Sequence, residues 1–180
     1  FNEVLDKIEA HYGPIIASLG ARLIVNRKWE DGTVNASAMR HENDYIIEMY
    51  GGLARHNQIT RDAFALVACH EIGHHLGGAP RFSRGGYLSH RKLWASVEGQ
   101  SDYFSGLKCL RVLFSNEVEN QDFVDTHEID PTLRENCEEV WNTREEKNRC
   151  MRIGIAGLSA ANMFYDVIGL ENIFPRPRFD

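Results

Sequence analysis

The spacing of apolar residues changes along the first fifty positions from that of a helix to that of strands. Apolar side chains recur at helical intervals over residues 2–12, which predicts a helix that ends at Gly13-Pro14. Residues 21–29 are rich in β-branched and aromatic side chains and predict a strand, with a hairpin-type turn at Asp31-Gly32. Two further strands are expected after that turn, over residues 33–39 and 44–49.

From Thr60 onward the apolar residues return to the period of a helix. Thr60 is a suitable N-cap, and Gly77-Gly78 should stop this helix near Leu76. Residues 80–92 are polar and contain glycine, as a loop does. A second long helix is expected over residues 93–114, where apolar side chains form a continuous stripe.

The C-terminal third also has a helical pattern, with one interruption. Thr143 and Glu146 have the form of a capping box, so a new helix should begin there after a break near Asn142. A small sheet followed by helices predicts an α+β fold. The 180 residues fit one domain over positions 1–180, since no linker or repeat divides them. We therefore expect an antiparallel-rich N-terminal sheet followed by a helical bundle.

Composition and charge exclude several classes of partner. The formal net charge is −6 and no cluster of Lys and Arg stands out, which argues against nucleic acid or an anionic membrane. No apolar run reaches the roughly 18 residues that a membrane span needs. Four cysteines and a start at Phe1 without an initiator Met favour an extracytoplasmic protein, secreted or periplasmic. The oligomeric state is left open.

The four cysteines, Cys69, Cys109, Cys137 and Cys150, form no CxxC pair, so a zinc ribbon or finger is not expected. Their even number fits one or two disulfides, with three possible pairings. Cys137 and Cys150 would lie about 20 Å apart on one continuous helix, so their pairing requires the break described above. We expect a Cys137–Cys150 bridge, and we expect Cys69 and Cys109 to be buried and either free or paired.

The strongest chemical signal is His70-Glu71-Ile72-Gly73-His74, which has the form HExxH inside a predicted helix. The i, i+4 spacing places His70 and His74 on one helix face, where both imidazoles can bind one metal ion. Glu71 then lies beside the metal and can act as a general base toward a bound water. His75 is i, i+5 from His70 and off that face, so it should be a polar flank or a loop anchor.

A catalytic zinc site usually has a third protein ligand and an open position. Pro80 occupies the position of the third His in the HExxHxxGxxH pattern, which excludes that pattern. The segment from His70 resembles instead the active site of gluzincin metallopeptidases, in which the third ligand is a Glu from a following helix with an Asp four residues later. Glu98 and Asp102 match that pair. The resemblance implies Glu98 as the third zinc ligand and Asp102 as hydrogen-bond acceptor from a ligand His.

Compact relatives of the Ste24/HtpX-type prenyl-protease group are the most similar gluzincins, over about residues 33–114. This resemblance implies a zincin-like fold in which an antiparallel edge strand binds the peptide or protein substrate through backbone hydrogen bonds. That strand falls on four residues, Asn35, Ala36, Ser37 and Ala38.

The residues predict a zinc site in which Glu71 is the general base, and the resemblance implies that the protein is a zinc metalloendopeptidase with Zn²⁺ as its cofactor. The alternative is a zinc-binding interaction module that is catalytically silent, or a latent form blocked by its own residues 174–179. A second donor for the tetrahedral oxyanion is also needed. The sequence leaves it open among Tyr87, His90, Arg111, His127 and Tyr165.

Overall fold

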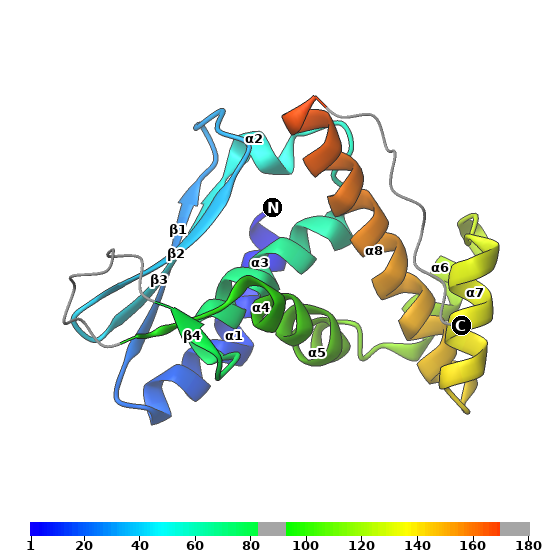
Figure 1. Ribbon diagram of the computed structural model, residues 1–180, viewed down its shortest axis with the longest axis horizontal. Coiled ribbons are helices and arrows are strands. Elements are labelled where there is room, and N and C mark those ends of the chain that lie inside the picture. Colours follow the sequence, from blue (N-terminus) through cyan, green and yellow to red (C-terminus); the bar gives the residue numbers. More distant parts are fainter. Residues whose placement is uncertain (83–92, 170–180) are drawn as a thin grey trace.

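The computed structural model describes residues 1–82 and 93–169, and these form a mostly helical α+β fold with a small sheet (Figure 1). The strands are β1 (Arg22–Lys28), β2 (Ala36–His41), β3 (Asp44–Tyr50), β4 (Arg81–Phe82) and β5 (Ala95–Ser96). The helices are α1 (Asn2–Ser18), α2 (Gly51–Ala54), α3 (Arg61–Leu76), α4 (Glu98–Phe104), α5 (Leu110–Leu113), α6 (Glu117–Thr126), α7 (Pro131–Val140) and α8 (Arg144–Ile168). A single π-helical turn, η1 (Ser105–Cys109), joins α4 to α5. The α+β prediction is therefore confirmed.

The main sheet is mixed, with the strand order β1-β3-β2. β1 runs parallel to β3, from Arg22 opposite Asp44 to Lys28 opposite Tyr50. β2 pairs with β3 in the antiparallel sense, so β2 is an edge strand of this sheet. The main sheet therefore has one parallel and one antiparallel pair of strands, whereas we predicted an antiparallel-rich sheet.

The hairpin predicted at Asp31-Gly32 is wrong, because β1 does not pair with β2. The chain does turn near Asp31, whose carboxylate accepts a hydrogen bond from the backbone N–H of Thr33 at 2.9 Å. The hairpin lies instead between β2 and β3, where Glu42 takes a left-handed φ of 52°. An Asp-Gly pair indicates a local turn, but it does not determine which strands pair across the sheet.

Two helix boundaries also differ from the prediction. α1 continues through Gly13-Pro14 to Ser18, and its fully buried Ile16 extends the core-facing row of Ile8. Packing of this apolar face therefore outweighs the local stop signal. The helix expected from residue 93 begins only at Glu98, because the residues before it form β5, which pairs with β4.

Other boundaries are confirmed. The Thr60 side chain accepts a hydrogen bond from the N–H of Ala63, and α3 ends at Leu76. α7 and α8 are separated at residues 141–143, and the Thr143 side chain caps α8 by accepting from the N–H of Glu146.

Helix α3 is the centre of the fold. Figure 1 shows the main sheet on one side of α3 and α8 on the other. α6 and α7 lie beside the N-terminal half of α8. The main core is built by apolar side chains of α1, the sheet, α3, the α4–α5 segment and α8. A smaller core around Ile129, Cys137 and Met151 lies among α6, α7 and the first half of α8.

Two disulfides connect these layers. The predicted Cys137–Cys150 bridge is present and joins α7 to α8, with the two Cα atoms 5.8 Å apart. Cys69 and Cys109, for which pairing was left open, also form a disulfide, and it joins α3 to η1. Within residues 1–82 and 93–169, none of the helices combines the length and the apolar character that crossing a membrane demands.

Candidate metal centre

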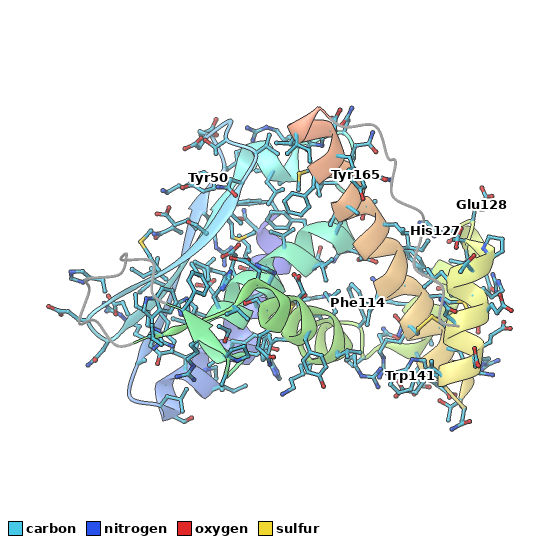
Figure 2. The ribbon with its side chains drawn as sticks, viewed as in Figure 1. Tyr50, Phe114, His127, Glu128, Trp141 and Tyr165 are labelled. Carbon is cyan, nitrogen blue, oxygen red and sulfur yellow. A yellow bond between two sulfur atoms is a disulfide. The ribbon has the colours of Figure 1, made fainter. Side chains whose placement is uncertain are left out.

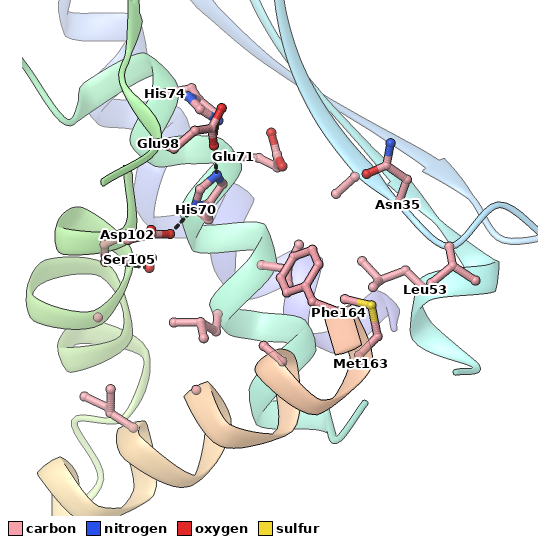
Figure 3. Close-up of a pocket in the computed structure, with 18 residues that line it drawn as sticks. Asn35, Leu53, His70, Glu71, His74, Glu98, Asp102, Ser105, Met163 and Phe164 are labelled. Carbon is pink, nitrogen blue, oxygen red and sulfur yellow. Dashed lines mark hydrogen bonds and ion pairs between the residues drawn. The ribbon is translucent and has the colours of Figure 1, made fainter. Parts of the chain in front are cut away.

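The two histidines of the HExxH motif face a single carboxylate oxygen (Figure 3). Glu98 Oε2 lies 3.1 Å from His70 Nε2 and 3.5 Å from His74 Nε2. Two ligand atoms of a tetrahedral zinc ion, each at about 2.0–2.1 Å from the metal, stand about 3.3 Å apart. The Glu98 oxygen therefore lies at ligand spacing from both imidazole nitrogens.

Glu71 belongs to the same cluster. One atom from each of His70, Glu71 and His74 lies within 4.8 Å of the others, so these three residues could hold a metal ion. Glu71 and Glu98 are thus both candidates for the carboxylate ligand. The Glu98 oxygen has the spacing of a metal ligand from both imidazole nitrogens. Figure 3 shows the Glu71 carboxylate beside the histidines and facing the open side of the cluster.

His70 is oriented by a carboxylate behind it. Its Nδ1 lies 2.8 Å from Asp102 Oδ1, so Nδ1–H donates to Asp102 and leaves the lone pair of Nε2 facing Glu98. Burial is the largest single influence on the pKa of His70 and lowers it. The hydrogen bond with Asp102 and the charges of Glu71, Asp102 and Glu98 together outweigh burial, and the pKa is raised.

His74 is held by different groups. The ring is buried, and its Nδ1 lies 2.9 Å from the backbone oxygen of Ser96 and 3.0 Å from the hydroxyl of Ser101. Because a backbone carbonyl can only accept, Nδ1 carries the hydrogen and Nε2 faces the cluster. Both serines were missed by the sequence prediction. Ser101 is i, i+3 from Glu98 on α4, which is the one signal that would have identified it.

Close contact between α3 and α4 depends on Gly73 within the motif. A Cβ at that position would lie 2.9 Å from the Cα and the backbone oxygen of Ser101. Since real Cβ atoms are not tolerated so near to backbone, a side chain there would push α4 away from α3. The glycine therefore allows Glu98 to reach both histidines.

The cluster opens into a cavity of about 490 Å³. Its polar end is formed by His70, Glu71, His74, Glu98 and Asp102. The remaining lining is mostly apolar and comes from α2, the middle of α3, residues 34–36 at the start of β2, η1 and α8. Figure 3 shows Met163 and Phe164 of α8 on the side of the cavity away from the imidazoles.

The four residues expected to bind substrate divide into two pairs. Asn35 and Ala36 line the cavity, and Figure 3 places Asn35 across from Glu71. Ser37 and Ala38 belong to the edge strand β2 but do not line the cavity, and Ala38 packs into the core at 3% exposure. Strand alternation does not explain this division, because Ala36 and Ala38 are two positions apart and point to the same face of the sheet. The cavity is lined by residues 34–36, so it reaches only the start of β2.

Of the two roles that we expected for His75, polar flank or loop anchor, the polar flank is wrong, since the side chain is buried. It stacks between the rings of Tyr45 and Trp94, and its Nε2 lies 3.1 Å from the backbone oxygen of Ile46. Burial lowers its pKa to about 3. Arg40 of β2 donates a hydrogen bond to the backbone oxygen of His75 at 3.1 Å. His75 therefore ties the end of α3 to the sheet.

The candidates for a second oxyanion donor do not meet at the cavity where the structure describes them. His127 stacks on Phe123 beside α6, and Figure 2 shows its position at that end of the molecule. Arg111 pairs with Glu146. Neither of them, nor Tyr165 of α8, is among the residues that line the cavity. Tyr87, His90 and residues 174–179 lie outside the described residues.

Comparisons with models of known protein families, with curated proteins and with solved structures find no match to this chain. Its function is therefore inferred from the geometry of the site.

Proposed function

We propose that this protein is a zinc-dependent metallopeptidase of the gluzincin type, with a zincin-like arrangement of α3, α4 and the edge strand. The observation that carries the proposal is the position of one Glu98 oxygen at 3.1 and 3.5 Å from the Nε2 atoms of His70 and His74. Two imidazoles and one carboxylate are a ligand set of hydrolytic zinc enzymes, which keep the fourth position for water or substrate. The cavity gives that fourth position access to a ligand.

The role of each residue follows from its place in the cluster. His70, His74 and Glu98 would hold the metal, while Asp102, Ser96 and Ser101 keep the two Nε2 atoms directed toward it. Bound zinc supplies a water whose pKa is lowered to about 7 and a Lewis acid for the scissile carbonyl.

Glu71 is the proposed general base. It shares the cluster with both imidazoles, and its carboxylate faces the cavity. It would take the proton of the attacking water and return that proton to the leaving amine. Asn35 and Ala36 at the start of β2 would bind the substrate on the opposite side. A peptide can add to an edge strand through backbone hydrogen bonds, and β2 is such a strand.

The two disulfides support an extracytoplasmic location as part of this proposal, because disulfides persist in oxidising compartments.

A paired measurement tests the function. Zinc content and cleavage of a peptide library are measured for the wild type and for Glu71→Gln, with Glu128→Gln as a control at an exposed position far from the cluster (Figure 2). We expect one zinc per chain in all three proteins. Cleavage should fall by at least about 100-fold in Glu71→Gln alone, as loss of a general base predicts.

Equal cleavage by the wild type and Glu71→Gln would reject Glu71 as the base. Stoichiometric zinc without cleavage by any of the three would favour the silent or latent zinc module.

A further inference from the structure

The wall of the cavity opposite the metal cluster is apolar and belongs to the last helix. Ile153, Gly157, Ala160 and Phe164 recur along α8 at intervals of three and four residues, so they share one helix face. Met163 adds to the same wall. The other apolar side chains of the lining belong to α2, α3 and the start of β2, and they are Leu53, Leu66, Val67, Val34 and Ala36. Charged side chains in the described lining are confined to the metal end.

This wall is held in place by contacts with the region that leads into α3. Ser159 of α8 accepts a hydrogen bond from the N–H of Thr60 at 3.0 Å and donates one to the backbone oxygen of Gln58 at 2.6 Å. Arg152 donates two hydrogen bonds to the carboxylate of Asp62, at 2.7 and 3.1 Å. Because these contacts fix α8 relative to the metal helix, the cavity exists before any ligand enters.

Gly154 and Gly157 lie one turn apart on α8, and their surroundings differ. A Cβ at Gly154 would lie 2.4 Å from a methyl carbon of Leu133, so packing against α7 explains that glycine. A Cβ at Gly157 would meet nothing within 4 Å, and Gly157 lines the cavity. Glycine is unfavourable inside a helix. Packing therefore does not require a glycine at position 157, and the open space beside Gly157 belongs to the cavity.

The size and lining of the cavity indicate what it can bind. Its volume of about 490 Å³ falls within the range of about 300–1,000 Å³ that is typical of ligand sites. A mostly apolar lining with a polar cluster at one end fits an apolar side chain attached to a polar backbone group. A charged side chain placed against α8 would lose water without gaining a partner in the described lining.

We propose that the α8 wall is a substrate subsite that accepts one large apolar side chain, aliphatic or aromatic, next to the scissile bond. Gly157 sets the depth of this subsite. The inference rests on the proposed peptidase function, because it takes the metal cluster as the place where the peptide bond is cleaved.

The first test uses peptides that differ at one position only. Each carries Ala, Leu, Phe, Asp or Lys there, and kcat/KM is measured for the wild type, Gly157→Ala and Gly157→Leu. We expect the wild type to prefer Leu and Phe over Asp and Lys by at least about 10-fold, the scale of discrimination by an apolar pocket. Gly157→Leu should lose about 10-fold on the Phe peptide and shift the preference toward Ala. Gly157→Ala is the matched control and should keep the wild-type order.

The second test does not require catalysis. The N-acetyl amides of leucine, phenylalanine and aspartate are titrated into protein whose methionine methyl groups are labelled for NMR. We expect the first two to shift the Met163 methyl signal, with binding at least about 10-fold weaker for the aspartate compound. The shift should disappear in Gly157→Leu and remain in Gly157→Ala. Met49 and Met151 do not line the cavity and serve as internal controls.

The outcomes separate the subsite from the catalytic proposal. Peptide cleavage without any apolar preference would overturn the subsite and leave the peptidase proposal standing. Failure of all peptides to be cleaved, together with the expected Met163 shifts and their loss in Gly157→Leu, would support the subsite while the peptidase proposal fails. No Met163 shift with either apolar compound would overturn the subsite.

Discussion

The cavity has two walls that are built in different ways. The metal wall consists of α3 and α4, and the hydrogen bonds that the imidazole Nδ1 atoms form with Asp102, Ser96 and Ser101 set the direction of each ring. The α8 wall is apolar, and its position depends on contacts such as Arg152–Asp62, which joins residues 90 positions apart. The metal wall therefore determines the positions of individual ligand atoms, whereas the α8 wall determines the size and shape of the cavity.

This difference implies that the walls respond differently to substitution. A change at Glu98 or Asp102 of the metal wall should alter zinc affinity with little effect on the stability of the fold, because both side chains are exposed. A change in the anchors of α8 should alter stability and leave the ligands of the metal in place.

Arg152→Met should give the largest loss of stability. The Arg152 and Asp62 side chains are only 11% and 12% exposed, and the substitution would leave the Asp62 carboxylate buried without its partner. Breaking a buried pair in this way costs about 3–5 kcal/mol. Urea unfolding followed by circular dichroism measures the free energy of unfolding, and zinc titration should find the affinity of the folded variant unchanged.

Arg22→Met is the matched control, because Arg22 forms a similar bidentate pair with Asp44 at an exposed position. Solvent screens that pair, so its loss should change stability far less. If the two variants unfold at the same urea concentration, the Arg152 pair is not what anchors α8.

Removal of the second disulfide should also act on the α8 side alone. The Cys137→Ala, Cys150→Ala double variant opens a loop of 13 residues, and bridges of this size contribute about 3 kcal/mol. Thermal and urea unfolding without reductant should show this loss, with zinc affinity retained. The Cys69→Ala, Cys109→Ala variant is the comparison, because Cys69 precedes His70 and its bridge ties α3 to the segment that follows α4. A loss of zinc affinity in both variants would mean that the two walls are coupled.

Glu98→Ala tests the metal wall directly. Removal of a residue that only orients a ligand lowers metal affinity by about 10- to 100-fold, so loss of the Glu98 oxygen itself should exceed about 100-fold. Competition with a fluorescent zinc chelator measures this affinity, and the urea midpoint of the metal-free protein should not move. Glu128→Ala is the control at an exposed position far from the cluster. Full zinc affinity in Glu98→Ala would assign the third ligand to Glu71.

The metal wall was largely predictable because its information is local in the sequence. The spacing of His70 and His74 requires only a helix, and the Thr60 cap and the end at Leu76 are both confirmed. Glu98 and Asp102 share one face of α4 for the same reason. The Cys137–Cys150 bridge was predictable because the capping residues of α8 revealed the break that it needs.

The features that were missed depend on residues far apart in the chain. The parallel pairing of β1 with β3 is set by how the sheet packs, and the Asp-Gly turn carries no such information. The Ser96 oxygen that orients His74 is a backbone atom, which no side-chain motif records. The α8 wall begins at Ile153, 79 residues after His74, in a helix whose pattern indicates only an amphipathic surface. Burial of His75 likewise depends on Tyr45 and Trp94 from other elements.

Asp102 gives the smallest and most selective test of the metal wall. Asp102→Ala removes the acceptor that lies 2.8 Å from His70 Nδ1 and should lower zinc affinity by about 10- to 100-fold, again by chelator competition. Asp102→Asn should lose less, because its amide oxygen can still accept from Nδ1–H. Asp125→Ala on the exposed surface of α6 controls for the loss of one negative charge. If Asp102→Ala and Asp125→Ala weaken zinc equally, net charge explains the effect. A graded loss, Ala greater than Asn, would instead show that the hydrogen bond orients the ligand, as the geometry of this wall requires.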